Sequence, residues 1–199
     1  MKIVISSGGK FHSFELAESL KKNKVFFFSS YPTYYLKKFF DTKLSFKYYP
    51  IFIKEVLQRI LLKLFGSYFY KYSFDYYINY LYERFVISKI KKIKNVDIFT
   101  GWSGFSYFTF LNVSDKTIKI LERGSTHIKY QDKIIKDLYT KYGYKNISIS
   151  KKIIQKEISE YDLSDYIITS SKFSKNTFLN YGINENKIFN VPYGCDLKL

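Results

Sequence analysis

The sequence predicts an α/β fold in which helices flank a Rossmann-like parallel sheet. Short apolar runs rich in β-branched residues alternate with longer segments of helical periodicity, and this alternation is typical of βαβ units. The 199 residues are 46% hydrophobic and include 21 Tyr and 20 Phe, which supports a buried core and excludes a disordered polycation. We therefore expect one folded domain over residues 1–199.

Seven apolar runs are expected to be strands, because each is short, is rich in Ile, Val, Phe or Tyr, and is bounded by polar or turn residues. The expected strands are 3–5, 25–28, 46–49, 96–99, 117–121, 166–169 and 188–191. The run 46–49 closes an irregular, aromatic stretch that otherwise predicts a long loop between Pro32 and Pro50.

Six segments show helical periodicity. The expected helices are 14–20, 51–65, 74–91, 132–139, 151–161 and 171–181. The helix 51–65 has the clearest pattern, since apolar residues from Ile53 to Leu64 share one side opposite Lys54 and Arg59. That helix either packs on the sheet or rests with its apolar side on an anionic membrane. The helix 74–91 is aromatic almost all round, which indicates burial on more than one side.

The formal net charge is +16, and nearly all of the excess comes from lysines spread along the chain. Such a charge suits nucleic acid or an anionic membrane surface, because clustered cations gain by neutralising phosphates. Solvated helix faces and an AT-rich coding bias produce the same composition. The charge therefore leaves both a functional anionic partner and a passive origin open.

Cys195 is the only cysteine, and His12 and His127 are the only histidines, so an internal disulfide and a His/Cys metal site are both excluded. The first apolar run is too short for a signal peptide, and no run of about 18 apolar residues could span a bilayer. We expect a cytoplasmic protein, soluble or peripheral on the inner face of the cell membrane, that needs no metal.

Three loops are candidate sites, because ligands of open parallel sheets bind outside the carboxyl ends of the strands. These loops are Gly8-Gly9, residues 100–104 and residues 122–127. The glycine pair could let the backbone approach a phosphate or could simply form a tight turn. It lacks the spacing of a dinucleotide-binding fingerprint and of a P-loop.

Three side chains in the other two loops have both a functional and a structural interpretation. Trp102 offers a stacking face for a sugar ring, or belongs to the core. Arg123 could clamp a phosphate or pair with Glu122. His127 could accept a hydroxyl proton or hydrogen-bond a sugar, or could be structural. The sequence shows neither the carboxylate pair of a glycosidase nor a Ser/His/Asp set.

The last 40 residues carry an ordered series of motifs. They are Glu160–Ser171, Phe173-Ser174, Gly182-Ile183, Lys187-Ile188 and Val191-Pro192-Tyr193-Gly194-Cys195-Asp196. This order resembles the close of the N-terminal domain in glycosyltransferase family four (glycosyl transferases group 1), whose members have the GT-B fold. Residues 122–127 resemble a Glu-Arg-Gly-Ser segment found in a subset of that family, and residues 1–9 resemble its opening strand and glycine loop.

The resemblance implies retaining transfer of a sugar from a nucleotide-sugar to a hydroxyl acceptor, generally without a metal. It further implies a role in the synthesis of cell-surface polysaccharide, lipopolysaccharide or glycolipid. Gly8 and Gly9 would pass the donor diphosphate, and His127 would face the reaction centre or the acceptor. The remaining acceptor-side candidates are His12, Trp102 and Ser103.

The resemblance also predicts that the C-terminal donor-binding domain is absent from these 199 residues, so that the chain is a fragment or a degenerate protein, or a separate chain completes it. We therefore expect little activity from this polypeptide alone. A basic nucleic-acid-binding module and a non-catalytic partner subunit of a split glycosyltransferase are the alternatives. The ordered motifs favour the glycosyltransferase, with a glycan or glycolipid acceptor and no nucleic-acid partner.

Overall fold

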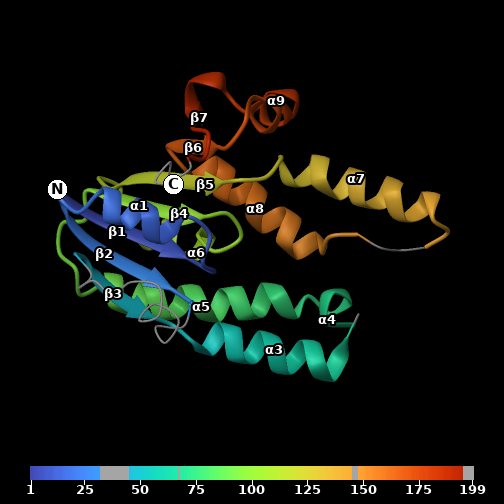
Figure 1. Cartoon of the computed structure of the whole chain (residues 1–199), viewed down its shortest axis with the longest axis horizontal. Coiled ribbons are helices and arrows are strands. Elements are labelled where there is room, and N and C mark those ends of the chain that lie inside the picture. Colours follow the sequence, from blue (N-terminus) through green and yellow to red (C-terminus); the bar gives the residue numbers. More distant parts are fainter. Residues whose placement is uncertain (32–44, 67, 145–147, 195–199) are drawn as a thin grey trace, which may run out of the picture.

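The computed structural model describes residues 1–31, 45–66, 68–144 and 148–194, which form one sheet of seven parallel strands (Figure 1). The strand order is β3-β2-β1-β4-β5-β6-β7. The strands are β1 (Lys2–Ser7), β2 (Lys24–Ser29), β3 (Lys47–Pro50), β4 (Ile98–Trp102), β5 (Ile118–Arg123), β6 (Tyr166–Thr169) and β7 (Ile188–Asn190). The predicted α/β fold with a helix-flanked parallel sheet is confirmed, and each of the seven expected strands is present.

Helices connect the strands and cover the sheet. They are α1 (Ser13–Ser19), α3 (Ile53–Phe65), α4 (Tyr68–Lys71), α5 (Phe74–Ile90), α6 (Tyr107–Phe110), α7 (Ile128–Lys141), α8 (Lys151–Leu163) and α9 (Lys172–Asn180), with a 3₁₀ turn η1 (Glu185–Lys187). The six expected helices are present, and α7 begins at Ile128, earlier than the expected residue 132. The sequence did not predict α4 and α6, and the long loop expected before β3 and the single Cys195 lie outside the described residues.

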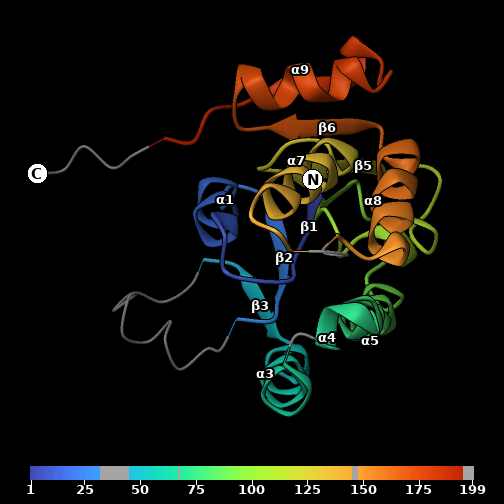
Figure 2. The same ribbon diagram turned by 90° about the vertical axis from the view of Figure 1, so that its right-hand side faces the viewer.

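Both faces of the sheet are buried, because successive side chains of a strand point to opposite faces. On β1, Ile3 and Ile5 join Phe14 of α1 in one apolar cluster, whereas Val4 joins Tyr82 of α5 in another. Figure 2 shows the corresponding layers, with α1 on one side of the sheet and α5 and α8 on the other. Burial on both faces explains why the strands appear in the sequence as continuous apolar runs.

Helix α5 is tied to the carboxyl end of β1 by the hydroxyl of Tyr82. That oxygen lies 2.9 Å from the Ser7 carbonyl oxygen and 3.1 Å from Ser6 Oγ. Tyr82 is fully buried, and the ring of Phe105 meets it edge-on at 6.1 Å. Tyr82 therefore fixes the position of the residues that lead into the glycine loop, from the face of the sheet that α5 covers.

Helix α3 packs along α5 and keeps most of its apolar side chains in solvent (Figure 1). Its only buried residue is Lys54, whereas Val56, Ile60 and Leu64 are 53%, 48% and 71% exposed. The expected apolar side is thus present, but only part of it, including Leu57 and Leu61, is half-buried, and the rest faces solvent. No helix in the described part of the chain is long and apolar enough to cross a bilayer.

Candidate functional site

The carboxyl ends of the strands share one edge of the sheet, and a cavity of about 890 Å³ opens there. Three segments far apart in the sequence border it: the start of α1 with His12, the end of β5 with Glu122, and the segment after β7 with Tyr193. Parallel topology brings them together, because each follows or ends a strand of the same sheet. The cavity lies where a ligand of such a sheet is expected.

His12 and Glu122 form a pair at the wall of the cavity. Nε2 of His12, the N-terminal cap residue of α1, lies 3.5 Å from Oε2 of Glu122. The imidazole is 32% exposed, while the carboxylate is 6% exposed. A histidine that lies beside a buried carboxylate and is open to a cavity can take up a proton from a hydroxyl group.

Two aromatic rings enclose the His12 imidazole. The ring centroid of Trp102 lies 5.2 Å from it and that of Tyr193 lies 4.6 Å from it. Trp102 is only 4% exposed and belongs to the apolar cluster beneath α1, so the structure gives it a core position in contact with the site. Tyr193 is 56% exposed, so part of its ring is available for a sugar to stack on.

Gly124 makes room for Tyr193 at the end of β5. A Cβ atom at Gly124 would lie 2.0 Å from the Tyr193 hydroxyl oxygen. Burial, together with the charge of Glu122, raises the pKa of the Tyr193 hydroxyl, which therefore stays protonated at pH 7 and can donate a hydrogen bond. Among the described residues, no group of three or more His, Cys, Asp or Glu side chains is placed to hold a metal ion.

Gly8 and Gly9 form a turn whose carbonyl oxygens are held by serine hydroxyls. Ser30 Oγ donates to the Gly8 carbonyl at 2.7 Å, and Ser7 Oγ donates to the Gly9 carbonyl at 2.6 Å. A Cβ atom at Gly8 would lie 2.3 Å from the Phe105 ring. Packing alone therefore requires glycine at position 8, and contact of this loop with a diphosphate stays a prediction.

Arg123 and Ser103 turn toward α8, away from His12. Neighbouring residues on a strand point to opposite faces, so Glu122 and Arg123 diverge. Arg123 Nη1 pairs with Glu157 Oε2 at 2.9 Å, rather than with Glu122, and its Nη2 donates to Gln131 Oε1 at 2.8 Å. Ser103 Oγ donates to the same Glu157 at 2.8 Å. Both side chains are engaged within the fold, and their substrate-binding roles stay predictions.

A buried carboxylate fills the loop after β4. Glu160 accepts hydrogen bonds from the backbone N–H groups of Gly104 at 2.6 Å, Ser106 at 2.8 Å and Tyr107 at 3.0 Å. Burial raises the pKa of Glu160 to about 8, although Lys156 and the Gly104 N–H oppose that shift. Backbone amides that could have bound an anion are thus already occupied by the protein's own carboxylate.

His127 caps helix α7 and does not line the cavity. Its Nδ1 accepts a hydrogen bond from the Lys129 N–H at 3.2 Å, and its ring stacks on Tyr181 at 4.4 Å. The side chain is buried, and burial lowers the pKa of His127 to about 4, with Lys129 and Arg123 adding to the effect. The imidazole is therefore neutral at pH 7. In this position the His127 side chain caps α7 and packs against aromatic rings, and catalysis by His127 stays a prediction.

The sequence supplied some members of the site and missed others. His12 was expected on the acceptor side from the family resemblance, but Glu122 was expected only as a partner of Arg123, and Tyr193 only as part of a motif. The alternation of β5 was the available signal, since it sends Glu122 and Arg123 to opposite faces. Which face α1 and His12 occupy depends on the crossover between β1 and β2, which linear spacing does not reveal.

Comparison with known proteins identifies the fold. No family model matches the chain, and no curated protein matches its sequence. The solved structures to which the chain is similar include UDP-GlcNAc 2-epimerase from Methanocaldococcus jannaschii (TM-score 0.52, 16% identity, covering 96% of this chain and 45% of that chain). They also include a putative UDP-N-acetylglucosamine 2-epimerase from Listeria monocytogenes (TM-score 0.51, 14% identity, 94% and 44%). A third is a UDP-glucosyltransferase from Polygonum tinctorium capable of glucosylating indoxyl (TM-score 0.51, 9% identity, 96% and 51%).

These neighbours are GT-B proteins, and the chain spans about half the length of each. The likeness covers nearly the whole of this chain, so its seven-stranded sheet and flanking helices correspond to one half of a GT-B fold. Sequence identities of 9% to 16% establish the fold and nothing finer. Membership of family four stays a prediction.

Proposed function

We propose that this chain is the acceptor-side half of a glycosyltransferase that moves a sugar from a nucleotide-sugar to a hydroxyl group. The half-GT-B architecture supports the proposal, and so does the cavity at the carboxyl ends of the strands. The similar structures are named as enzymes of UDP-linked sugars. For this reason we propose a nucleotide-sugar as the donor.

The pairing of His12 with Glu122 is the observation that carries the proposal. One ring nitrogen of His12 lies 3.5 Å from the Glu122 carboxylate, which leaves the other nitrogen for a hydroxyl group of the acceptor. As the hydroxyl oxygen bonds to the anomeric carbon and the bond to the nucleotide diphosphate breaks, His12 takes the hydroxyl proton. Glu122 stabilises the imidazolium that forms.

This chemistry bears on the stereochemical outcome. A base that deprotonates the attacking hydroxyl is what a single displacement requires, and a single displacement inverts the anomeric centre. Retention, which the family resemblance implies, would leave His12 with a binding role only. The anomeric configuration of the product, read by NMR, distinguishes the two mechanisms.

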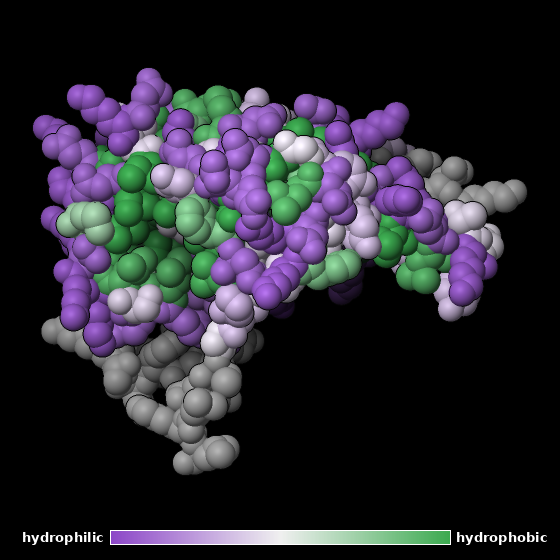
Figure 3. Space-filling view, turned by 90° about the horizontal axis from the view of Figure 1, so that it is seen from above, coloured by the Kyte–Doolittle hydropathy of each residue, from purple (hydrophilic) through white to green (hydrophobic). Residues whose placement is uncertain are grey.

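The surroundings of the cavity favour an acceptor with both polar and apolar parts, such as a glycan or a glycolipid. Tyr193 offers a ring face beside His12, and Val191 on the same rim is 52% exposed. An apolar area ringed by polar side chains is also present on the face seen from above (Figure 3). We place the reaction in cell-surface polysaccharide, lipopolysaccharide or glycolipid synthesis.

Helix α3 supports a position on the inner face of an anionic membrane. Its exposed apolar side chains Val56, Ile60 and Leu64 form a stripe at helical spacing, flanked by exposed Arg59 and Lys63. An apolar stripe beside basic residues suits insertion among acyl chains next to anionic headgroups. This arrangement would keep the cavity near a lipid-linked acceptor.

A donor-binding half, on the same polypeptide or on a separate chain, completes the proposed enzyme. Gly8 and Gly9 would face the donor diphosphate at the boundary between the halves. Because most stabilisation of the leaving diphosphate comes from the donor half in such an arrangement, we expect little transfer from the 199 residues alone.

A transfer assay tests the proposal. The chain, with and without a fused or co-expressed donor half, is offered a panel of nucleotide-sugars and candidate acceptors, and nucleotide release is measured. We expect activity only with the donor half, and a loss of about 10²- to 10⁴-fold in His12→Ala. Loss in His127→Asn but not in His12→Ala would assign the chemistry to His127 instead. Inactivity in every combination, with tight salt-sensitive oligonucleotide binding, would favour a nucleic-acid module.

A further inference from the structure

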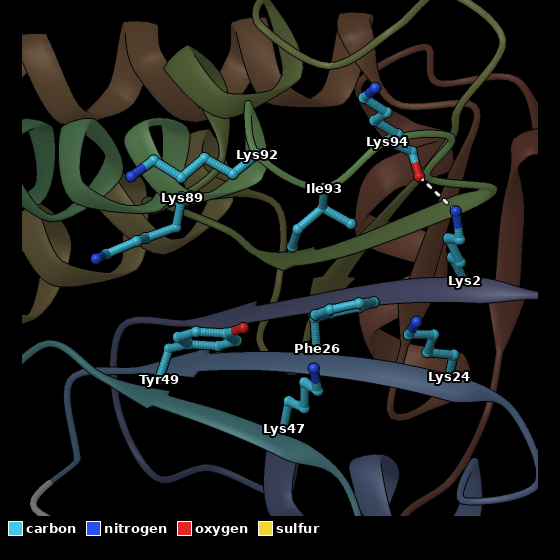
Figure 4. A pocket seen from close by; sticks show the side chains of 9 residues that line it. All are labelled: Lys2, Lys24, Phe26, Lys47, Tyr49, Lys89, Lys92, Ile93 and Lys94. Carbon is cyan, nitrogen blue, oxygen red and sulfur yellow. Dashed lines mark hydrogen bonds between the residues drawn. The ribbon is translucent and has the colours of Figure 1, made fainter.

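A second cavity lies at the opposite edge of the sheet, where the strands begin. It occupies about 520 Å³ between strands β1 to β3 and the segment that follows α5 (Figure 4). Phe26, Tyr49 and Ile93 form its apolar part. Its other lining residues are Lys2, Lys24, Lys47, Lys89, Lys92 and Lys94. No acidic side chain is present among the described residues that line it.

The lysines reach this cavity from three directions. Lys24 and Lys47 extend from neighbouring strands, and their ammonium groups lie 5.8 Å and 5.9 Å from the centre of the Phe26 ring (Figure 4). Lys89 and Lys92 extend from the end of α5 and the turn beyond it, and their ammonium groups are directed away from Lys24 and Lys47. Lys2 Nζ donates to the Lys94 carbonyl oxygen at 2.7 Å across the third side.

These ammonium groups have no carboxylate partner among the described residues. Elsewhere lysines do form ion pairs, such as Lys175 with Glu185 at 2.7 Å. Asp97, close to the start of β1, binds the backbone N–H of Lys2 at 2.7 Å instead of an ammonium group. Gathered cations without counter-ions repel one another, so the cluster gains free energy when an anion binds among them.

Ordinary structural roles account for only part of the cluster. Lys89 lies in the last turn of α5, where a positive charge stabilises the helix dipole. That role does not extend to the strand residues, because Lys2 and Lys24 are register partners on adjacent strands, and like charges placed opposite each other are destabilising. A bound anion removes this repulsion.

We propose that the lysine cavity binds a small anion that carries two or more phosphate groups. Lysine ammonium groups bind phosphate oxygens through charge-assisted hydrogen bonds, and those of Lys24 and Lys47 both lie beside the Phe26 ring. Tyr49, which is partly exposed, gives an apolar surface for the remainder of the ligand. Because the cavity lies at the edge of the sheet opposite His12, the proposal does not depend on the proposed transferase function.

Titration calorimetry with inorganic tripolyphosphate at low salt tests the proposal. The double variant Lys24→Gln/Lys47→Gln removes two charges from the cavity, whereas Lys91→Gln/Lys116→Gln removes two exposed charges that do not line it. We expect saturable binding by the unchanged chain, at least about tenfold weaker binding by the cavity variant, and a change within about twofold for the control. Lys89→Gln/Lys92→Gln provides a second cavity variant, and thermal unfolding verifies that each variant is folded.

A parallel experiment with vesicles containing phosphatidylglycerol separates the two sources of phosphate. Binding of vesicles alone, lost in the cavity variants and kept in the control, would identify lipid headgroups as the ligand. Binding of tripolyphosphate with the same variant pattern would identify a free phosphorylated molecule. The proposal is wrong if neither probe binds, or if the cavity and control variants weaken binding equally, since diffuse charge would then explain it.

Discussion

The Phe105 ring requires glycine at position 8. The φ of Gly8 is not in the left-handed region, and it is the Phe105 ring, 2.3 Å from the position of a Cβ atom, that excludes a larger residue. The glycine loop therefore depends on packing across the sheet as well as on turn geometry. This contact supplies a test that is independent of any ligand.

We predict that Gly8→Ala lowers the free energy of unfolding by about 1–3 kcal/mol, because the added methyl group overpacks against Phe105. Denaturant unfolding measures the change. Gly194→Ala is the matched control, since no atom lies within 4 Å of its Cβ position, and it should stay within about 0.5 kcal/mol. Phe105→Leu in the Gly8→Ala background should recover part of the loss, and equal stability of Gly8→Ala and the unchanged chain would contradict this packing argument.

His127 makes stability depend on pH. Its pKa falls from 6.5 in the unfolded chain to about 4 in the fold, chiefly through burial. Above about pH 6.5 both states are neutral; as the pH falls from 6.5 toward 4, the unfolded state takes up the proton first, and stability is lost. We expect roughly 2–3 kcal/mol of loss from this group between pH 7 and pH 4.5.

Denaturant unfolding at the two pH values, compared with His127→Asn, measures this effect. Asn keeps a neutral acceptor that can cap α7 but does not titrate. The variant should therefore lose less stability than the unchanged chain on acidification. Identical pH profiles would show that His127 titrates equally in the folded and unfolded states.

Single residues of the site were predictable from the sequence only where they lie in a loop that follows a predicted strand. Loops after strands identified Gly8, Trp102 and His127 as candidates, because strand ends are visible in the sequence. Which of those side chains meet was not visible, since Glu122 reaches His12 through the stacking order of strands and the face that α1 covers. Burial of His127 among aromatic rings likewise depends on α8 and α9, which are distant in sequence.

Among the helices, length decided what the sequence revealed. α3 and α8 run for several turns, and the sequence shows their apolar periodicity. α4 and α6 have four residues each, too few to show a period. α7 starts early because His127 caps it, whereas its Gly/Ser-rich approach resembles a loop.

Helix α3 leads to a prediction about membrane contact. Replacing Val56 and Ile60 by Asn removes two exposed apolar side chains from its stripe, so the free energy of unfolding should change by no more than about 0.5 kcal/mol for each. Co-sedimentation with anionic vesicles should fall several-fold, because apolar insertion supplies part of the binding.

Ile134→Asn on α7 is the control for this experiment. Ile134 is 48% exposed, as Ile60 is, but lies on another helix. Its replacement should leave vesicle binding unchanged. Vesicle binding that does not respond to anionic lipid, or that falls equally in both variants, would remove the proposed membrane role of α3.

Across the molecule, a buried ion pair joins α5 to α8. Lys156 Nζ lies 2.5 Å from Glu83 Oε1, and the exposed fractions of the two side chains are 1% and 0%. Lys156 also donates to the Gly104 carbonyl at 2.9 Å, and Glu83 accepts from the Thr109 N–H at 2.9 Å. Two long helices and the loops after β4 therefore meet at one charged centre.

We predict that Glu83→Gln lowers the free energy of unfolding by about 3–5 kcal/mol, because it leaves the Lys156 charge buried without its partner. Glu83→Gln/Lys156→Met should recover most of that loss, since the double variant removes both charges. Thermal and denaturant unfolding measure both. Glu185→Gln, which breaks an exposed pair with Lys175, should change stability little. A small effect of Glu83→Gln would mean that water reaches Lys156.

The outer strands of the described sheet have a consequence for how the molecule behaves at high concentration. β3 has four residues and ends at Pro50, and β7 has three residues. A proline has no N–H to donate, and short edge strands offer few free backbone groups for pairing with a strand from another molecule. Growth of the sheet into intermolecular fibrils is therefore disfavoured, and any self-association should instead proceed through side-chain surfaces such as that of α3.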